Sequence, residues 1–150
     1  MSDYTFMKTG NNITEDNEIP DEAFDMASIM TLFTKKGLQN SSCYVKHSCR
    51  PSITAEDIKR GLMIEMFLFS KRPNLLPEVQ EVKKALMDDS DSDTEDTELP
   101  LTEDITPFSL SPCTCALCKS MNDIYIKWSS FKPNPGIEDI LYKNINKVPT

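Results

Sequence analysis

The stretch CYVKHSCRPSITAEDIKRGLMIEM, from Cys43 to Met66, decides how the chain folds, because it ends one helical pattern and starts another at once. Proline disfavours helical geometry at the residue before it, so Pro51 predicts that the first helix ends at Arg50. The second helix is predicted to begin after Thr54, whose hydroxyl can accept the backbone N–H of Asp57 while the Asp57 carboxylate reaches back to the Thr54 amide. Two helices joined by a short connector are therefore expected here.

The segment before the connector carries an apolar stripe with helical spacing. It opens at Ile19-Pro20-Asp21, where proline suits a helix start. The spacing predicts one helix from about Ala23 to Cys49, roughly 40 Å long at 1.5 Å per residue. Such a helix is longer than the core of a chain of this size, so a partner chain could cover its remaining apolar side. The stripe comprises Ala23, Met26, Ala27, Met30, Phe33, Tyr44 and Val45.

Further short helices are predicted downstream. Ile58, Leu62 and Met66 give the second helix an apolar side, and a third helix follows the prolines at 73 and 77. Two more are expected near the C-terminus, before and after Pro133 and Pro135. The apolar positions that predict these later helices are Val79, Val82 and Leu86, then Met121, Ile124, Tyr125 and Trp128, then Ile137, Ile140, Leu141 and Ile145.

The formal net charge of -8 comes from one segment. Nine acidic residues and no Lys, Arg or His lie between Asp88 and Asp104, so the remainder of the chain has a net charge of +1. This segment has too few apolar groups to offset the entropy lost on ordering, and we expect it to be disordered. The chain then divides into an N-terminal arm (1–18), a helical domain (19–87), an acidic disordered linker (88–112) and a Cys-containing helical tail (113–150).

A long helix, an Arg-containing connector and a short capped helix resemble the histone fold. The segment from Ile19 to about Met63 is similar to archaeal histones and to histone-fold subunits of transcription complexes, most specifically in KHSCRPSITAEDIKRGL. The expected fold is therefore all-α, with a histone fold in residues 19–87 and extra C-terminal helices after the linker. The resemblance implies an ion pair between Arg50 and Asp57, and antiparallel pairing with another histone-fold chain, either a copy of itself or a different one. The implied dimer interface is Met26, Met30, Phe33, Tyr44, Ile53, Ile58 and Leu62.

The same resemblance implies a non-enzymatic role in transcription or chromatin. The candidate DNA contacts are Lys46, Arg50, Lys59 and Arg60, but residues 19–87 have ten basic and eight acidic side chains, a weak basis for wrapping DNA. Cys49 also stands where the family has glycine. The alternative is an acidic adaptor that binds basic proteins such as histones through residues 88–104, in the manner of a chaperone.

Several classes of protein are excluded by missing patterns. The chain has one His, no Gly-rich phosphate loop and no Ser-His-Asp set, so we expect it not to be an enzyme. It has neither a long apolar run nor a signal pattern, so we expect no membrane partner and an intracellular location, nuclear or in a viral factory. Lys greatly exceeds Arg and Asn is frequent, which suggests an AT-rich genome such as that of a large virus or a protist.

The cysteines leave a choice between zinc and free thiols. Five cysteines is an odd count, and Cys113, Cys115 and Cys118 place three thiols within six residues, which is dense enough for Zn²⁺ as a candidate cofactor. Zinc takes four ligands, and the alternative is a metal-free turn held by packing of the helix that follows. We favour the metal-free turn, because only three ligands are near one another. The fourth ligand could be Asp123, Cys43, His47, Cys49 or a partner's residue, and the turn would be held by Met121, Tyr125 and Trp128.

Overall fold

A computed structural model gives the structure of residues 20–88 and 106–149, and within these ranges every regular element is a helix. The all-α prediction is confirmed. The N-terminal arm and residues 89–105 of the acidic linker lie outside the described residues. None of the helices in the described ranges is long and apolar enough to span a membrane. The elements are α2 (Asp21–His47), α3 (Ala55–Leu68), the 3-10 turn η1 (Phe69–Lys71), α4 (Leu75–Met87), α5 (Ala116–Asn122), α6 (Ile124–Ser130) and α7 (Ile137–Asn146).

The long helix α2 ends at His47 and not at Arg50, which corrects the expectation drawn from the proline. The backbone conformation at Cys49, one residue before Arg50, ends the helix. Cys49 adopts the left-handed conformation with φ 57°, its N–H donates to Lys46 O at 3.1 Å, and the Arg50 N–H donates to Val45 O at 3.3 Å. This pair of bonds is the Schellman motif, in which the left-handed residue is usually glycine.

Replacing Cys49 by Gly is therefore expected to stabilise the chain. A left-handed conformation costs an L-residue roughly 1–2 kcal/mol that glycine does not lose, and part of this gain is cancelled because glycine is also freer in the unfolded chain. We expect Cys49→Gly to raise the free energy of unfolding by about 0.5–1 kcal/mol in urea denaturation, while Cys49→Ala should leave it within error. Destabilisation by the glycine would contradict the motif.

Helices α2 and α3 approach each other closely because glycines face each other at their contact. A Cβ on Gly61 would lie 2.5 Å from Gly37 O, and a Cβ on Gly37 would lie 2.6 Å from the Leu62 side chain. Ser41 adds a hydrogen bond across the same contact, from its hydroxyl to Asp57 O at 2.9 Å. Gly37 and Ser41 are weak helix formers in the middle of α2, and their role in this contact explains why the sequence tolerates them there.

A buried polar network ties α3 to α2 and to the segment before α4. The Glu65 carboxylate is fully buried, and it accepts two hydrogen bonds from the Arg72 guanidinium and one from Asn40 Nδ2 at 2.7 Å. Helix α4 then packs along α2, where Lys36 pairs with Glu78 at 2.9 Å.

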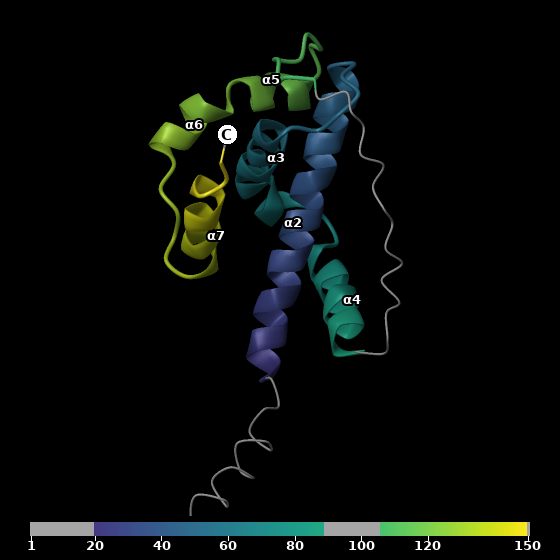
Figure 1. Cartoon of the computed structure of the whole chain (residues 1–150). Coiled ribbons are helices and arrows are strands. Elements are labelled where there is room, and N and C mark those ends of the chain that lie inside the picture. Colours follow the sequence, from purple (N-terminus) through teal and green to yellow (C-terminus); the bar gives the residue numbers. More distant parts are fainter. Residues whose placement is uncertain (1–19, 89–105, 150) are drawn as a thin grey trace, which may run out of the picture.

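The C-terminal helices α6 and α7 pack on α3, and α5 packs on both α3 and α2. Figure 1 shows them on the opposite side of α2 from α4, so that one chain covers α2 on two sides. The shared core brings together Phe33, Tyr44, Met63 and Ile64 from α2 and α3 with Cys118, Met121, Ile124, Trp128, Leu141 and Ile145 from the tail.

Candidate metal centre

Three cysteines of the tail meet the single histidine of the chain at the end of α2. The ligand atoms of His47, Cys113, Cys115 and Cys118 all lie within 4.8 Å of one another. His47 Nδ1 faces the three sulfurs, at 3.6 Å from Cys113, 3.3 Å from Cys115 and 3.4 Å from Cys118. Of the fourth ligands considered from the sequence, His47 is the one that the fold brings to the thiols, so the reason for preferring a metal-free turn no longer holds.

The donor set fits tetrahedral Zn²⁺. Zinc binds Cys sulfur at about 2.3 Å and His nitrogen at about 2.0 Å, so at the tetrahedral angle a nitrogen and a sulfur ligand are about 3.5 Å apart. The three distances from His47 Nδ1 to the sulfurs range from 3.3 to 3.6 Å and match this edge length. Three thiolates and one imidazole would fill all four positions around such an ion, as is typical of a structural site, and would leave none open for a substrate.

Two elements position these side chains. His47 lies in the last turn of α2, while Cys115 is the N-cap of α5 and its sulfur accepts the Cys118 backbone N–H at 3.4 Å. The loop that carries Cys113 is fixed by Ser111, whose hydroxyl accepts the Cys113 N–H at 3.2 Å. The sequence spacing shows the three cysteines, but only the tertiary fold brings His47 to them.

Tyr44 anchors this loop to α2 from inside the core. Its side chain is fully buried, and its hydroxyl accepts the Ser111 backbone N–H at 3.1 Å while it donates to Asn122 Oδ1. The Asn122 amide in turn donates to Ser111 O at 3.1 Å. One tyrosine, placed one turn before His47, thus holds both the start of the cysteine loop and the end of α5.

Arg60 of α3 holds the same end of α5 as Tyr44 does. Its guanidinium donates to Met121 O at 2.9 Å and to Asn122 O at 3.0 Å, carbonyls that the end of a helix leaves without helical partners. The same group contacts two aromatic rings, at 4.8 Å from the centroid of Phe108, which precedes the tail, and at 4.7 Å from that of Tyr125 in α6. These two cation–π contacts, together with the hydrogen bonds to α5, make Arg60 a part of the tail's docking.

The thiols of the group differ in acidity. Hydrogen bonds from the backbone and thiol of Cys118 lower the pKa of Cys115 to about 6, whereas burial raises the pKa of Cys118 to about 11. Cys115 is therefore the first of the two to ionise. A bound cation would favour the thiolate at both positions, because metal binding releases thiol protons.

The residues expected at a dimer interface separate into two sets. Phe33 and Tyr44 are buried inside the chain, where Phe33 packs edge-on against Phe69 with centroids 5.4 Å apart and Tyr44 binds the tail. Both face the chain's own C-terminal helices. The remaining five lie nearer the surface, with Met26 and Ile53 exposed and Met30, Ile58 and Leu62 half-buried.

The four candidate DNA contacts separate in the same way. Arg50 and Arg60 are buried, and the Arg50 guanidinium forms an ion pair with Asp57, as the resemblance implies. Lys46 is exposed and Lys59 is half-buried. Two of the four candidate cations are thus held inside the fold. Only Lys46 and Lys59 of this set remain to contact DNA phosphates and displace their counterions.

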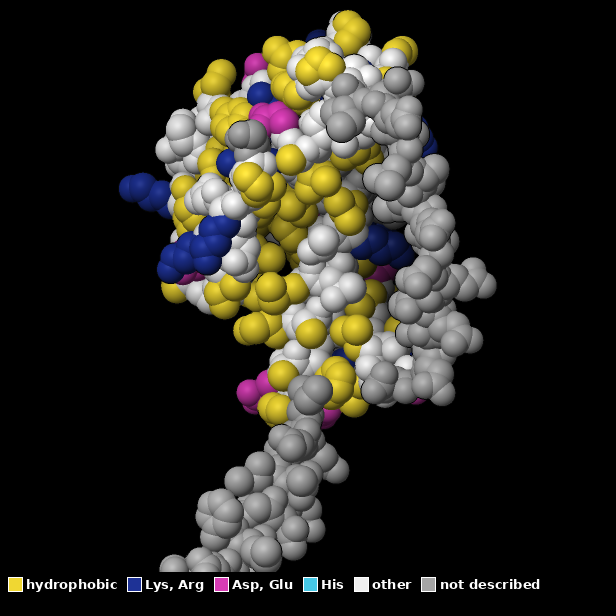
Figure 2. Space-filling model, viewed as in Figure 1, with side chains coloured by type: hydrophobic (Ala, Val, Ile, Leu, Met, Phe, Trp, Pro, Cys, Tyr) yellow, Lys and Arg dark blue, Asp and Glu magenta, His cyan; other side chains and the backbone are white. Residues whose placement is uncertain are grey.

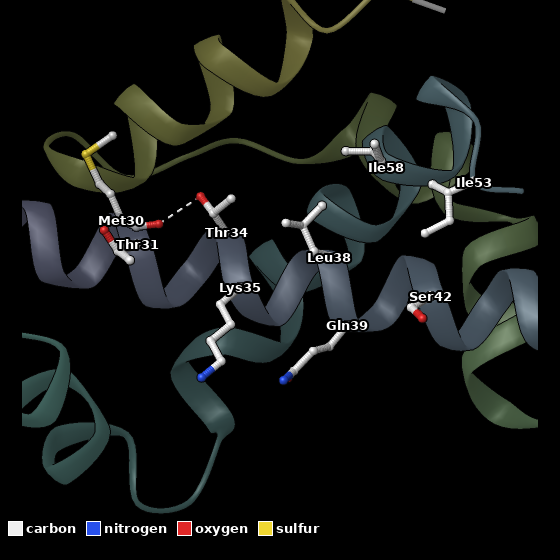
Figure 3. A pocket seen from close by; sticks show the side chains of 9 residues that line it. All are labelled: Met30, Thr31, Thr34, Lys35, Leu38, Gln39, Ser42, Ile53 and Ile58. Carbon is white, nitrogen blue, oxygen red and sulfur yellow. Dashed lines mark hydrogen bonds between the residues drawn. The ribbon is translucent and has the colours of Figure 1, made fainter. Parts of the chain in front are cut away.

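An apolar groove of ≈ 780 Å³ runs along the side of α2 that neither α4 nor the tail covers. Figure 3 shows Leu38 pointing toward Ile58, while Lys35 and Gln39 point to the other side of the helix. Figure 2 shows hydrophobic side chains gathered beside α2 on the face between the C-terminal helices and α4. The groove is lined by Met30, Thr31, Thr34, Lys35, Leu38, Gln39, Ser42, Ile53 and Ile58.

Comparison of this chain with known protein families, with curated proteins and with solved structures finds no match.

Proposed function

We propose that this chain is a non-enzymatic subunit with a histone fold that pairs with a second chain through the apolar groove along α2. The pairing of a 27-residue helix with a 14-residue capped helix, joined by a connector with an Arg50–Asp57 ion pair, supports the fold. The observation that carries the function is the groove itself. Its apolar side chains come from α2, the connector and α3, and α4 and the C-terminal helices pack elsewhere on the same body.

The groove has the features of a protein-binding surface. Leu38 near its middle is 43% exposed and Ile53 at its end is 46% exposed, so large apolar side chains face solvent along one line. Contiguous exposed apolar patches of this kind mark interaction sites on proteins. A second helix laid antiparallel along α2 would cover Leu38 and reach Ile53 and Ile58, the residues that the connector and α3 contribute.

The partner is another chain of the same fold, a second copy or a different one, and the setting is transcription or chromatin in a nucleus or viral factory. Direct DNA contact would depend on Lys46 and Lys59, since Arg50 and Arg60 are buried. The second candidate function is an acidic adaptor. It is supported only by the sequence of the acidic segment, because residues 89–105 lie outside the described part of the chain.

We further propose that His47 and the three tail cysteines bind one structural Zn²⁺. The support is the grouping of four ligand atoms and the match of the nitrogen–sulfur distances to a tetrahedral edge. The metal would connect the last turn of α2 to the loop before α5. Its role is then to hold the tail on the body of the chain.

Leu38→Glu is expected to abolish pairing. A carboxylate at the centre of an apolar interface must be desolvated, and losses of 2 kcal/mol or more at such positions correspond to at least a 30-fold weaker Kd. Light scattering of the full chain at tens of micromolar should give about twice the 17.0 kDa chain mass for wild type and a monomer for the variant.

The matched control is Leu76→Glu, since Leu76 is 70% exposed on α4, away from the groove. This variant should pair as wild type does. A folded wild-type monomer would exclude pairing with a second copy. The partner would then be a different chain, which should be recovered with wild type but not with Leu38→Glu. If Leu38→Glu pairs like wild type, the groove is not the interface.

A further inference from the structure

Cys43 lies beside the His47 ring, on the edge away from the tail cysteines. Its sulfur is 3.6 Å from His47 Nε2, whereas Nδ1 is the nitrogen that faces the three tail sulfurs. The two residues are four apart in α2, a spacing that places side chains on the same face of a helix. Each nitrogen of the imidazole therefore has sulfur as its neighbour, from a different part of the chain.

This arrangement fixes which nitrogen carries the proton when the metal is bound. A neutral imidazole has one N–H and one lone pair, and a metal at Nδ1 takes the lone pair there. The proton must then be on Nε2, where Cys43 Sγ lies within the range of a hydrogen bond to sulfur. Metal-bound histidines almost always donate their second N–H to a carboxylate, a backbone carbonyl or a water, which fixes the tautomer and the ring orientation. Here the Cys43 sulfur, a weak acceptor, lies in the place of that partner.

We propose that Cys43 is a positioning residue for the metal ligand His47. Its sulfur accepts the Nε2–H, keeps the Nδ1 lone pair directed at the three tail thiols, and so strengthens binding of Zn²⁺ without binding the ion. This role rests on the proposed zinc site. It also gives a structural reason for a cysteine one turn before His47, at a position outside the group of ligands.

The first test measures Zn²⁺ affinity of the full chain by competition with a chromophoric chelator. Cys43→Ala is expected to weaken zinc binding 10- to 100-fold, the usual effect of removing the partner of a ligating histidine. Cys49→Ala is the matched control, because Cys49 is a cysteine beyond the end of α2 and outside the ligand group, and its affinity should equal that of wild type. Cys43→Ser, which retains a hydrogen-bond acceptor, should restore part of the loss.

The second test observes the Nε2 proton of His47 directly. If Cys43 had only a structural role, its replacement would not change the exchange of this proton with water. His47 is the single histidine of the chain, so ¹⁵N labelling of histidine gives the signals of one imidazole. In zinc-saturated wild type, Nδ1 should be metal-bound and Nε2 protonated, with slow exchange of that proton with water. In zinc-saturated Cys43→Ala the proton should exchange at least several-fold faster.

The outcomes separate the two proposals. Wild-type protein that binds no Zn²⁺ overturns the zinc site and the role of Cys43 with it. Wild-type protein that binds Zn²⁺ through Nε2, or a Cys43→Ala variant with unchanged affinity and unchanged proton exchange, overturns only the role of Cys43. Unchanged unfolding of the metal-free variant shows that a loss of affinity does not come from misfolding.

Discussion

Cys115→Ser is expected to abolish stoichiometric zinc binding and to remove the stabilisation that zinc gives to the folded chain. A ligand that binds only the folded state stabilises it by about 4 kcal/mol when its free concentration is 1,000 times the Kd. The substitution separates the effect of zinc from that of helix capping. Cys115 also caps α5, and serine is among the best N-cap residues. The cap should thus survive the loss of the thiolate.

The measurement is urea unfolding of both proteins, with zinc in excess and with a chelator. Wild type should lose about 4 kcal/mol on chelation, under the same condition of 1,000-fold excess, whereas Cys115→Ser should unfold at the same urea concentration in both buffers. Cys49→Ser, which changes a cysteine outside the group, should behave like wild type. Elemental analysis of chelator-washed and reloaded wild type should find about one zinc per chain, as four ligands per site require.

Fluorescence gives an independent view of the tail. Trp128 is the single tryptophan of the chain, it is buried, and its Nε1–H donates to Asn146 Oδ1 at 2.9 Å. Loss of the metal should loosen the loop before α5 and shift Trp128 emission to the red. Zinc-free wild type with unchanged stability and unchanged emission would contradict the site.

The local features of the fold could be predicted from sequence because their causes are local. The apolar spacing in α2, the prolines and the Thr54 cap depend on residues within a few positions of one another, and Thr54 does accept the Asp57 N–H at 3.3 Å. The end of α2 was misplaced because the prediction relied on Pro51. A left-handed Cys49 stops the helix first, and a non-glycine residue gives no local signal for that conformation.

The candidate metal site could be predicted only in part. Cys113, Cys115 and Cys118 are neighbours in sequence, but His47 is more than sixty residues away, and it reaches them through the docking of α5 on the end of α2. A lone histidine near the end of a helix has no distinctive pattern. The one clue in the sequence was the number of ligands. Three thiols leave one of the four positions around zinc to fill, and the chain has one histidine.

The roles of Tyr44 and Arg60 were not visible in the sequence for a related reason. Both belong to faces of α2 and α3 that a partner chain could have covered, and periodicity does not tell which surface covers an apolar stripe. The structure covers them with the tail, through the Tyr44 hydroxyl and the stacked Arg60 guanidinium. The proposed pairing is thereby confined to the face of α2 that carries the groove.

Asp57→Ala is expected to destabilise the chain by about 3–5 kcal/mol, because it leaves the buried Arg50 guanidinium without its counter-charge. Asp57 is fully buried, and its carboxylate accepts bonds from both terminal nitrogens of Arg50 and from the backbone and hydroxyl of Thr54. The same change therefore breaks the capping box of α3. Urea unfolding should show the loss directly.

An exposed ion pair provides the matched control. Asp139 and Lys143 pair at 2.9 Å in α7, where the Lys143 side chain is 68% exposed and that of Asp139 is 35% exposed, so Asp139→Ala should cost at most about 0.5 kcal/mol. The double variant Arg50→Ala/Asp57→Ala should lose less than the sum of the two single variants, since neither charge is then left buried alone. Additive losses, or wild-type stability in Asp57→Ala, would show that the pair does not hold the connector.

The same pair predicts how stability depends on pH. Burial alone would raise the pKa of Asp57, but the hydrogen bonds from Arg50 and Thr54 outweigh it and lower the pKa below its usual value. A carboxyl with a lowered pKa in the folded state stabilises the chain fully above its unfolded pKa of about 3.9, and this stabilisation is lost as the pH falls through the folded value.

Metal-free wild type should thus lose stability more steeply below about pH 4 than metal-free Asp57→Ala, whose free energy of unfolding should change less over the same range. Chelated protein is needed for this comparison, because acid also protonates the cysteine and histidine ligands and releases zinc. Parallel acid profiles for the two proteins would mean that Asp57 does not carry this share of the stability.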